Sequence, residues 1–161
     1  MAELALARLP GDRRAYELEG VGRVRLEGWS ARRATLEAGG RTLTARRRGF
    51  LTSQAEAVDA GGAAVGTFAP PRRSLRRGGT VTWEGVERAL RPASSWRERY
   101  ALAEDDRELA LFEGKGWGKR PVCVLLADSG AVDPLLLLFC AFVVRALAED
   151  ASAAASTAAS A

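Results

Sequence analysis

The sequence contains no histidine, no asparagine and no isoleucine, and two of its 161 residues are cysteine. Without histidine the chain cannot build a Ser-His-Asp or Cys-His nucleophile system, and it has no imidazole for a metal ion. Without asparagine it has no site for N-linked glycosylation. The carboxylates that are present do not stand in apolar pairs suited to acid-base catalysis. We therefore expect a protein that is not an enzyme, with no catalytic residues, no metal and no cofactor.

The two cysteines, Cys123 and Cys140, both lie in apolar segments. Buried thiols act as small hydrophobic groups, and two thiols are too few for a four-ligand zinc site. The first ten residues carry Glu3 and lack the long apolar region of a secretory signal. Since nothing in this setting requires a disulfide, we expect a cytoplasmic protein.

Lysine is also scarce, because Lys115 and Lys119 are the only two among 24 basic residues and all the others are arginine. Abundant alanine, arginine and glycine, together with the missing residue types, indicate a GC-rich coding bias. The formal net charge of +4 is therefore weak evidence for an anionic partner. The aromatic residues do not alternate with the basic runs, as a base-stacking surface requires, which disfavours a nucleic-acid partner.

One strongly apolar run stands near the C-terminus, from Pro134 to Val144, and it has no polar face. Asp133 is a good N-cap and Pro134 suits the first helical position, so we predict a helix over about 133–148. A helix that is apolar on all sides is buried in a core or in a membrane. The run is shorter than the roughly 20 residues of a membrane span, which favours a core helix over a tail anchor.

Most of the chain before residue 128 alternates between apolar and polar residues, with the period of strands that have one buried face. Paired glycines such as Gly39-Gly40 and Gly61-Gly62 supply the positive φ of tight hairpins. We count about eleven strands at the short spacing of a sandwich or barrel. The segment 2–9 fits either a helical turn or an extra strand. The expected strands are 15–19, 24–27, 34–37, 41–46, 55–59, 63–68, 79–83, 86–91, 96–103, 108–113 and 121–126.

These elements predict a mainly β fold: a closed antiparallel barrel of about twelve strands around a central, hydrophobic C-terminal helix. A barrel of this width is not filled by its own side chains, so it requires an apolar plug. The segment 133–148 is the candidate for that plug. We expect a single domain over 1–150, followed by a disordered alanine- and serine-rich tail over 151–161.

Many short hairpin strands followed by the apolar segment 133–147 resemble the tubby C-terminal-like superfamily. It includes tubby proteins, phospholipid scramblases and the LURP-one-related proteins. The resemblance covers about residues 13–148, and turns such as Asp59-Ala60-Gly61-Gly62 are most similar to the LURP-one-related branch. It implies a twelve-stranded barrel around a hydrophobic helix and a binding role at a membrane, because tubby domains bind phosphoinositides and scramblases act on phospholipids. The tubby lipid-binding residues match no positions in this chain.

Two basic segments are candidate anion-binding sites. Guanidinium groups can hold a phosphate bidentately, and each basic residue near an anionic membrane contributes about 1 kcal/mol. In a glycine-rich stretch, backbone N–H groups and lysines can bind an anion while a tryptophan anchors at a membrane interface. The alternative for both segments is a solvated connection. The first segment comprises Arg72, Arg73, Arg76 and Arg77, and the second comprises Lys115, Trp117, Lys119 and Arg120.

Two further charged segments are weaker candidates. The run Arg46-Arg47-Arg48-Gly49-Phe50 ends a predicted strand, so its side chains cannot all face one way. The acidic run Glu104-Asp105-Asp106 lacks the spacing of a calcium-binding loop and fits a solvated turn.

The sequence thus favours a non-catalytic binding barrel for anionic phospholipid headgroups, cytoplasmic and peripheral at the membrane. The first alternative is a structural or protein-interaction module with no lipid ligand. The second is a tail-anchored membrane protein, with the segment 133–148 in the bilayer.

Overall fold

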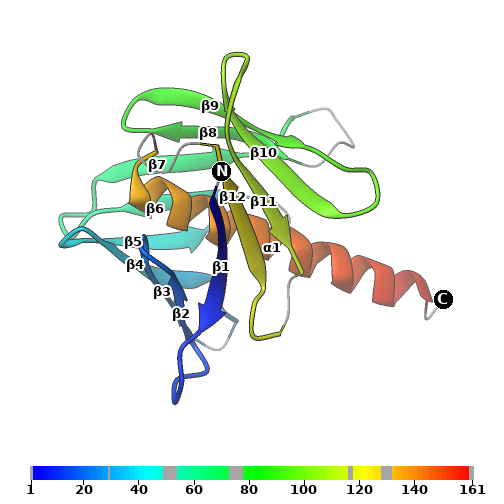
Figure 1. Cartoon of the computed structure of the whole chain (residues 1–161), viewed down its shortest axis with the longest axis horizontal. Helices are drawn as coiled ribbons and strands as arrows, with labels where there is room; N and C mark the ends of the chain where they lie inside the picture. The colour runs from blue at the N-terminus through cyan, green and yellow to red at the C-terminus, as the bar shows by residue number, and fades with distance from the viewer. Residues whose placement is uncertain are drawn as a thin grey trace.

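The computed structural model describes residues 2–28, 30–48, 54–72, 78–115, 118–127 and 132–159. Twelve antiparallel strands form a closed barrel in which each strand pairs with its neighbours in sequence, and β1 closes the barrel against β12 (Figure 1). The predicted fold is therefore confirmed. The elements are β1 (Ala2–Arg8), β2 (Ala15–Leu18), β3 (Gly22–Glu27), β4 (Arg33–Ala38), β5 (Arg41–Arg47), β6 (Ala55–Val58), β7 (Ala64–Ala69), β8 (Gly79–Trp83), β9 (Val86–Pro92), β10 (Glu98–Glu104), β11 (Arg107–Gly114), β12 (Val122–Leu126) and the helix α1 (Pro134–Ala159).

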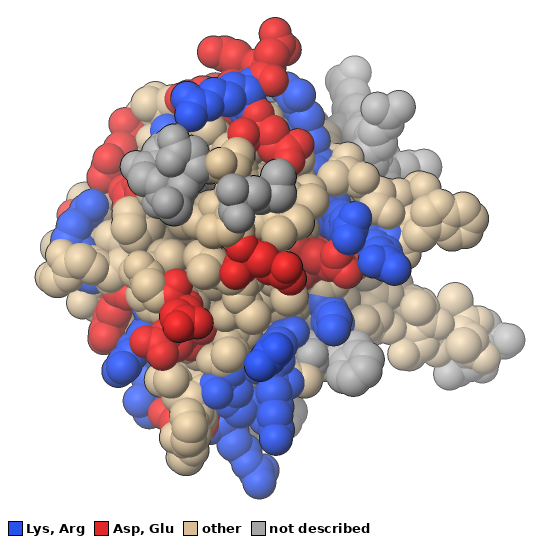
Figure 2. Space-filling model, in the orientation of Figure 1, with Lys and Arg blue, Asp and Glu red and all other residues tan. Residues whose placement is uncertain are grey.

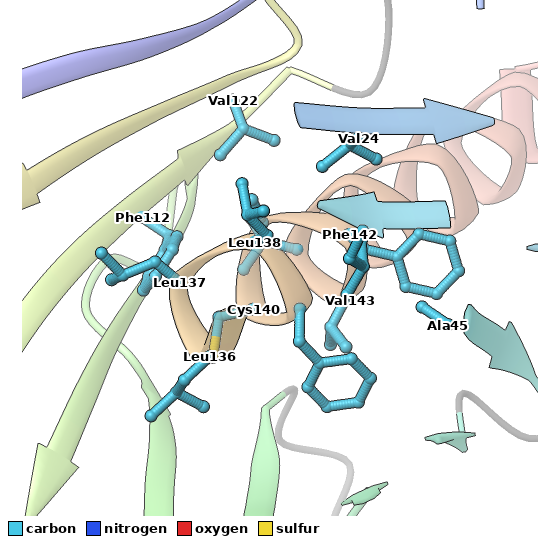
Figure 3. Packing of buried hydrophobic residues seen from close by; sticks show 14 of the residues in the cluster. Val24, Ala45, Phe112, Val122, Leu136, Leu137, Leu138, Cys140, Phe142 and Val143 are labelled. Carbon is cyan, nitrogen blue, oxygen red and sulfur yellow. The ribbon is translucent and has the colours of Figure 1, made fainter. Parts of the chain in front are cut away.

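The helix α1 passes through the interior of the barrel, and every residue from Leu135 to Val144 is buried. Its side chains point in all directions toward the wall, as Figure 3 shows for Leu138 and Phe142 among strand residues that include Val24 and Val122. Burial of each large apolar side chain contributes about 1.5–3 kcal/mol. The all-round apolar character of the run is thus explained by a wall that surrounds it.

Small wall residues make room for the helix. A methyl group added at Gly114 would lie 2.9 Å from Cγ1 of Val144. One added at Gly22 would lie 2.2 Å from the backbone oxygen of Glu37 in β4 and 2.9 Å from Cδ1 of Leu138. Ala34, Ala45 and Ala57 are completely buried. Real Cβ atoms do not come so close to other heavy atoms. Packed interiors leave few voids, so these two positions require glycine.

Asp133 fixes the first turn of α1 to the barrel wall. Its Oδ1 accepts a hydrogen bond from the backbone N–H of Leu135 at 2.9 Å, which confirms the predicted N-cap. Its Oδ2 accepts one from the indole Nε1 of Trp83 at 3.0 Å, and Nη1 of Arg41 lies 3.9 Å away. The Trp83 ring is tilted against Phe139, with centroids 5.5 Å apart. The cap therefore also joins the helix to β8.

The helix is longer than predicted. It continues to Ala159 instead of ending near residue 148, and residues 151–159, expected to be disordered, are helical. Alanine has the highest helix propensity, and a helix already formed inside the barrel extends without the cost of a new nucleus. Residues 152–159 are exposed. Among the described residues, no helix has both the length and the hydropathy that crossing a membrane requires.

Candidate functional site

The connections between strands divide into two groups. Because successive strands run in opposite directions, every second connection lies at the same end of the barrel. The connections after β2, β4, β6, β8, β10 and β12 lie at the end where α1 begins. Those after β1, β3, β5, β7, β9 and β11 lie at the end from which α1 leaves, where Val144 and Ala148 pass Gly114 at the end of β11.

The end from which α1 leaves is strongly basic, and we call it the basic end. In the described part of its connections, nine residues are basic and one, Asp12, is acidic. All of these basic residues except Arg32 are exposed. They are Arg13, Arg14, Arg32, Arg48, Arg72, Arg97, Lys115, Lys119 and Arg120.

The connections at the end where α1 begins carry the opposite charge, and we call this end the acidic end. Arg41, at the start of β5, pairs there with Glu84 and Asp133. Six acidic residues stand in the described part of the connections at this end, with no basic residue there: Glu19, Asp59, Glu84, Asp105, Asp106 and Asp133. Charge separated in this way produces a field along the barrel axis. Figure 2 shows Asp and Glu side chains at the top of the molecule, where Figure 1 places the β10–β11 connection.

The first predicted segment falls mostly outside the described residues. Arg72 is exposed at the basic end, at the start of the connection after β7. Arg73, Arg76 and Arg77 lie outside the described residues. The prediction for this cluster of four therefore stays a prediction.

The second predicted segment lies at the same end. Lys115, Lys119 and Arg120 are exposed, and Trp117 lies outside the described residues. The backbone N–H of Lys115 donates to the carbonyl of Pro121 at 2.7 Å, and that of Arg8 donates to the carbonyl of Lys119 at 2.8 Å. The Lys115 amide is thus used within the connection, whereas the side chains of Lys115, Lys119 and Arg120 are exposed and can contact an anion.

The barrel brings a second basic connection next to this one. Since β1 pairs with β12 on one side and with β2 on the other, the β1–β2 connection, which carries Arg13 and Arg14, is adjacent at the basic end to the connection that carries Lys119 and Arg120. Figure 2 shows Lys and Arg side chains gathered along the lower edge, where Figure 1 places both connections. No carboxylate in the described part of the chain forms an ion pair with these four residues. Their charge is available to an external anion.

The arginines at the end of β5 have internal partners instead. The Arg46 and Arg48 side chains both pair with Glu56, a carboxylate with 6% of its surface exposed, and Nη1 of Arg48 lies 3.4 Å from Oε2 of Glu56. Nη2 of Arg47 contacts Oδ2 of Asp150 at 2.6 Å. The prediction that this run cannot face one way is confirmed, and it has a structural role. Phe50 lies outside the described residues.

Trp96 is a residue that the sequence analysis did not single out. It lies in the connection after β9, where Oγ of Ser94 accepts backbone N–H groups of Trp96 and Arg97 at 3.2 Å each. The Trp96 side chain is 94% exposed. It lines a groove of about 910 Å³ whose other side is the projecting part of α1, at Ala151 and Ala155. Because every second connection lies at the same end of the barrel, counting the strands along the sequence would have placed Trp96 at the basic end.

Chemically reactive groups are few in the described residues. Burial raises the pKa of the Cys140 thiol to about 12, against the opposing charge of Arg88, so Cys140 stays protonated at neutral pH. Asp105 and Asp106 are exposed in a turn, as predicted. Within residues 2–28, 30–48, 54–72, 78–115, 118–127 and 132–159, no cluster of carboxylate and thiol groups is arranged to hold a metal ion.

No family model, no curated protein and no solved structure matches this chain.

Proposed function

We propose that this barrel is a non-catalytic module that binds anionic phospholipid headgroups through its basic end, as a peripheral protein on the cytoplasmic face of a membrane. The observation that carries the proposal is the separation of charge along the barrel axis. Nine basic residues and one acidic residue stand in the described connections of the basic end, against six acidic residues at the acidic end. Two of the nine, Arg48 and Arg97, are paired with Glu56 and Glu113, so the remaining basic residues carry the proposal.

The energetics support attachment by several weak contacts. Each basic residue near an anionic surface contributes about 1 kcal/mol, and this attraction falls off within a Debye length of about 8 Å at physiological salt. The exposed side chains of Arg13, Arg14, Lys119 and Arg120 have no ion-pair partner in the described part of the chain. A rigid barrel holds them at one end, in the way that scaffolds commonly carry functional loops.

The barrel interior supports a role without catalysis. In lipocalin-type barrels the interior holds a ligand, whereas here α1 fills it with buried leucine, phenylalanine and valine. The Cys140 thiol on α1 is buried and has a pKa raised to about 12 by that burial. A ligand therefore has to bind outside the barrel.

We also propose membership of the tubby C-terminal-like superfamily, on the LURP-one-related branch. The support is architectural, because a closed barrel of twelve strands surrounds one C-terminal hydrophobic helix. With no match to a solved structure, this assignment depends on the arrangement of elements.

The direct test is co-sedimentation with vesicles of phosphatidylcholine alone and of phosphatidylcholine with phosphatidylserine, each at low and high salt. We expect binding to the anionic vesicles at low salt and its loss at high salt. Equal binding to both vesicle types, or none, would contradict the proposal and favour a protein-interaction module.

A matched pair of variants locates the contact. Arg120→Glu reverses one charge at the basic end, and Arg107→Glu reverses one exposed charge at the start of β11, next to the acidic end. We expect the first to weaken binding to anionic vesicles and the second to leave it unchanged. Equal effects of the two would show that net charge alone, and not the basic end, drives binding.

A further inference from the structure

We propose that the barrel docks with its axis perpendicular to the membrane, so that the projecting part of α1, Ala151–Ala159, and the Trp96 side chain enter the headgroup layer. This inference rests on the proposed function. It adds the orientation of the molecule and names the two elements that enter the lipid.

The projecting part of α1 carries no charge. After Asp150 the described helix consists of alanine, serine and threonine, and residues 152–159 are exposed. Figure 1 shows this segment extending out of the barrel, away from the acidic end. At 1.5 Å per residue it extends about 13 Å, more than the depth of one headgroup layer. Basic connections therefore stand around an uncharged helical segment, and the β9–β10 connection lies beside it as far as Ala155.

The last charges of the helix are paired at the barrel mouth. Nη2 of Arg47 lies 2.6 Å from Oδ2 of Asp150, and Nη2 of Arg145 lies 2.9 Å from Oε1 of Glu149. Neither carboxylate has to be carried into the lipid when the following residues enter it. The boundary between charged and uncharged helix thus coincides with the end of the barrel.

Trp96 stands beside this segment. The groove that it lines has Ala151, Ser152 and Ala155 as its other wall, so the indole and the helix share one face of the basic end. Tryptophan favours the membrane-water interface, where its ring is apolar and its N–H stays hydrated. The other exposed large hydrophobic residue in the described part of the chain is Val86, at the start of β9 next to the acidic end.

The shape of the basic end favours a bilayer over a nucleic acid. The end of α1 extends past the β9–β10 connection (Figure 1), so a rigid, phosphate-lined duplex would meet this uncharged helix before it met that connection. A bilayer instead admits uncharged alanine and serine together with tryptophan between its headgroups. The acidic end repels the same anionic surface, so the charge separation orients the axis.

Depth measurements with a fluorescent label test the orientation. In a Cys123→Ser background, Cys140 stays unlabelled because it is completely buried. An environment-sensitive label is placed by Ala155→Cys on the projecting helix, or by Ala60→Cys in the exposed β6–β7 connection of the acidic end. On anionic vesicles we expect a blue shift and protection from an aqueous quencher at position 155, with no change at position 60.

The outcomes separate this inference from the proposed function. Co-sedimentation with equal responses at positions 155 and 60, or with no response at 155, would overturn the orientation and leave lipid binding intact. No co-sedimentation of the unlabelled protein would overturn both. Salt-sensitive binding of a duplex RNA without binding to vesicles would replace the membrane with a nucleic acid.

The two exposed hydrophobic residues give a label-free comparison. Trp96→Ser should lower the fraction bound to anionic vesicles several-fold, and Val86→Ser should leave it unchanged. Trp96 is 94% exposed and Val86 is 43% exposed, so neither belongs to the core and thermal unfolding should show both variants folded. Equal vesicle binding by Trp96→Ser and the unchanged protein would remove Trp96 from the contact.

Discussion

The two ends of this barrel are built from the same hairpins, yet they differ in length as well as in charge. At the acidic end, three connections are two residues long: Gly39-Gly40, Glu84-Gly85 and Asp105-Asp106. At the basic end, the shortest are the five residues 28–32 and 93–97. Two-residue turns with positive φ, such as 48° at Glu84 and 81° at Gly85, hold strands together and leave little surface for a ligand. Binding residues are expected on the longer connections, which is where the basic residues stand.

The two parts of α1 also differ, since one is buried in the barrel and the other is exposed at the basic end. Substitutions in the buried part should have the largest effect on folding. Phe139→Asp places a charge where no part of the side chain is exposed, so it should abolish folding to a soluble, cooperative protein. Ala155→Asp, on the exposed part of the same helix, should change the free energy of unfolding by about 0.5 kcal/mol or less. Urea unfolding and soluble yield measure both. A folded Phe139→Asp protein would contradict the plug.

The close contact between wall and helix predicts the next effect. Gly114→Ala adds a methyl group 2.9 Å from Cγ1 of Val144, and we expect it to lower the free energy of unfolding by about 1–3 kcal/mol. Gly61→Ala is the control, because its added Cβ meets only Oδ1 of Asp59 at 3.4 Å. Combining Gly114→Ala with Val144→Ala should cost less than the sum of the single changes, and strict additivity would place the strain elsewhere.

Substitution of one carboxylate at each end compares how firmly the ends hold the helix. Asp133→Ala removes the N-cap and the partner of the Trp83 indole, and it should cost about 1–2 kcal/mol in thermal or urea unfolding. Asp150→Ala removes a pair whose carboxylate is 47% exposed, and it should cost less than about 1 kcal/mol. The reverse order would mean that the helix is held mainly where it leaves the barrel.

The smallest effect concerns Glu149, next to the point where the helix leaves the barrel. Desolvation raises its pKa above the ordinary value of 4.5, against the opposing charges of Arg145 and Arg47. The folded protein therefore holds this proton more tightly than the unfolded chain, and the free energy of unfolding falls as pH rises through the interval between the two pKa values. Glu149→Gln should reduce that fall in urea titrations at a series of pH values, and an unchanged pH dependence would show that Glu149 does not cause it.

Most of the elements could be predicted because their signals are local. Alternation and paired glycines indicate hairpins within a few residues of each other, and Asp133-Pro134 indicates a helix start in the same way. Errors arose where a local signal had a competitor. The strand expected over 96–103 begins at Glu98 in the structure, because Oγ of Ser94 holds the backbone of Trp96 and Arg97 in a turn. The segment 2–9, left open by its sequence, is a strand because β12 and β2 pair with it.

The candidate site was only partly predictable, because local signals identify single residues and not which connections become neighbours. Exposed arginines and lysines in glycine- and proline-rich segments could be selected by composition, as Arg72 and Lys119 were. That the connection with Arg13 and Arg14 is adjacent to the one with Lys119 could not be predicted, because the two connections become neighbours only when β1 pairs with β12. Trp96 carried no local mark of function, and its importance depends on the helix that projects beside it.

Residues close together in the chain suffice to specify its hairpins, a helix start at Asp133 and an apolar segment that must be buried. Only the closed barrel decided that the apolar helix has a wall on every side, that it emerges among basic connections, and that the acidic turns lie at the opposite end. These features depend on which strands pair and on the number of strands that separate two connections. They therefore exist only once the whole chain has folded.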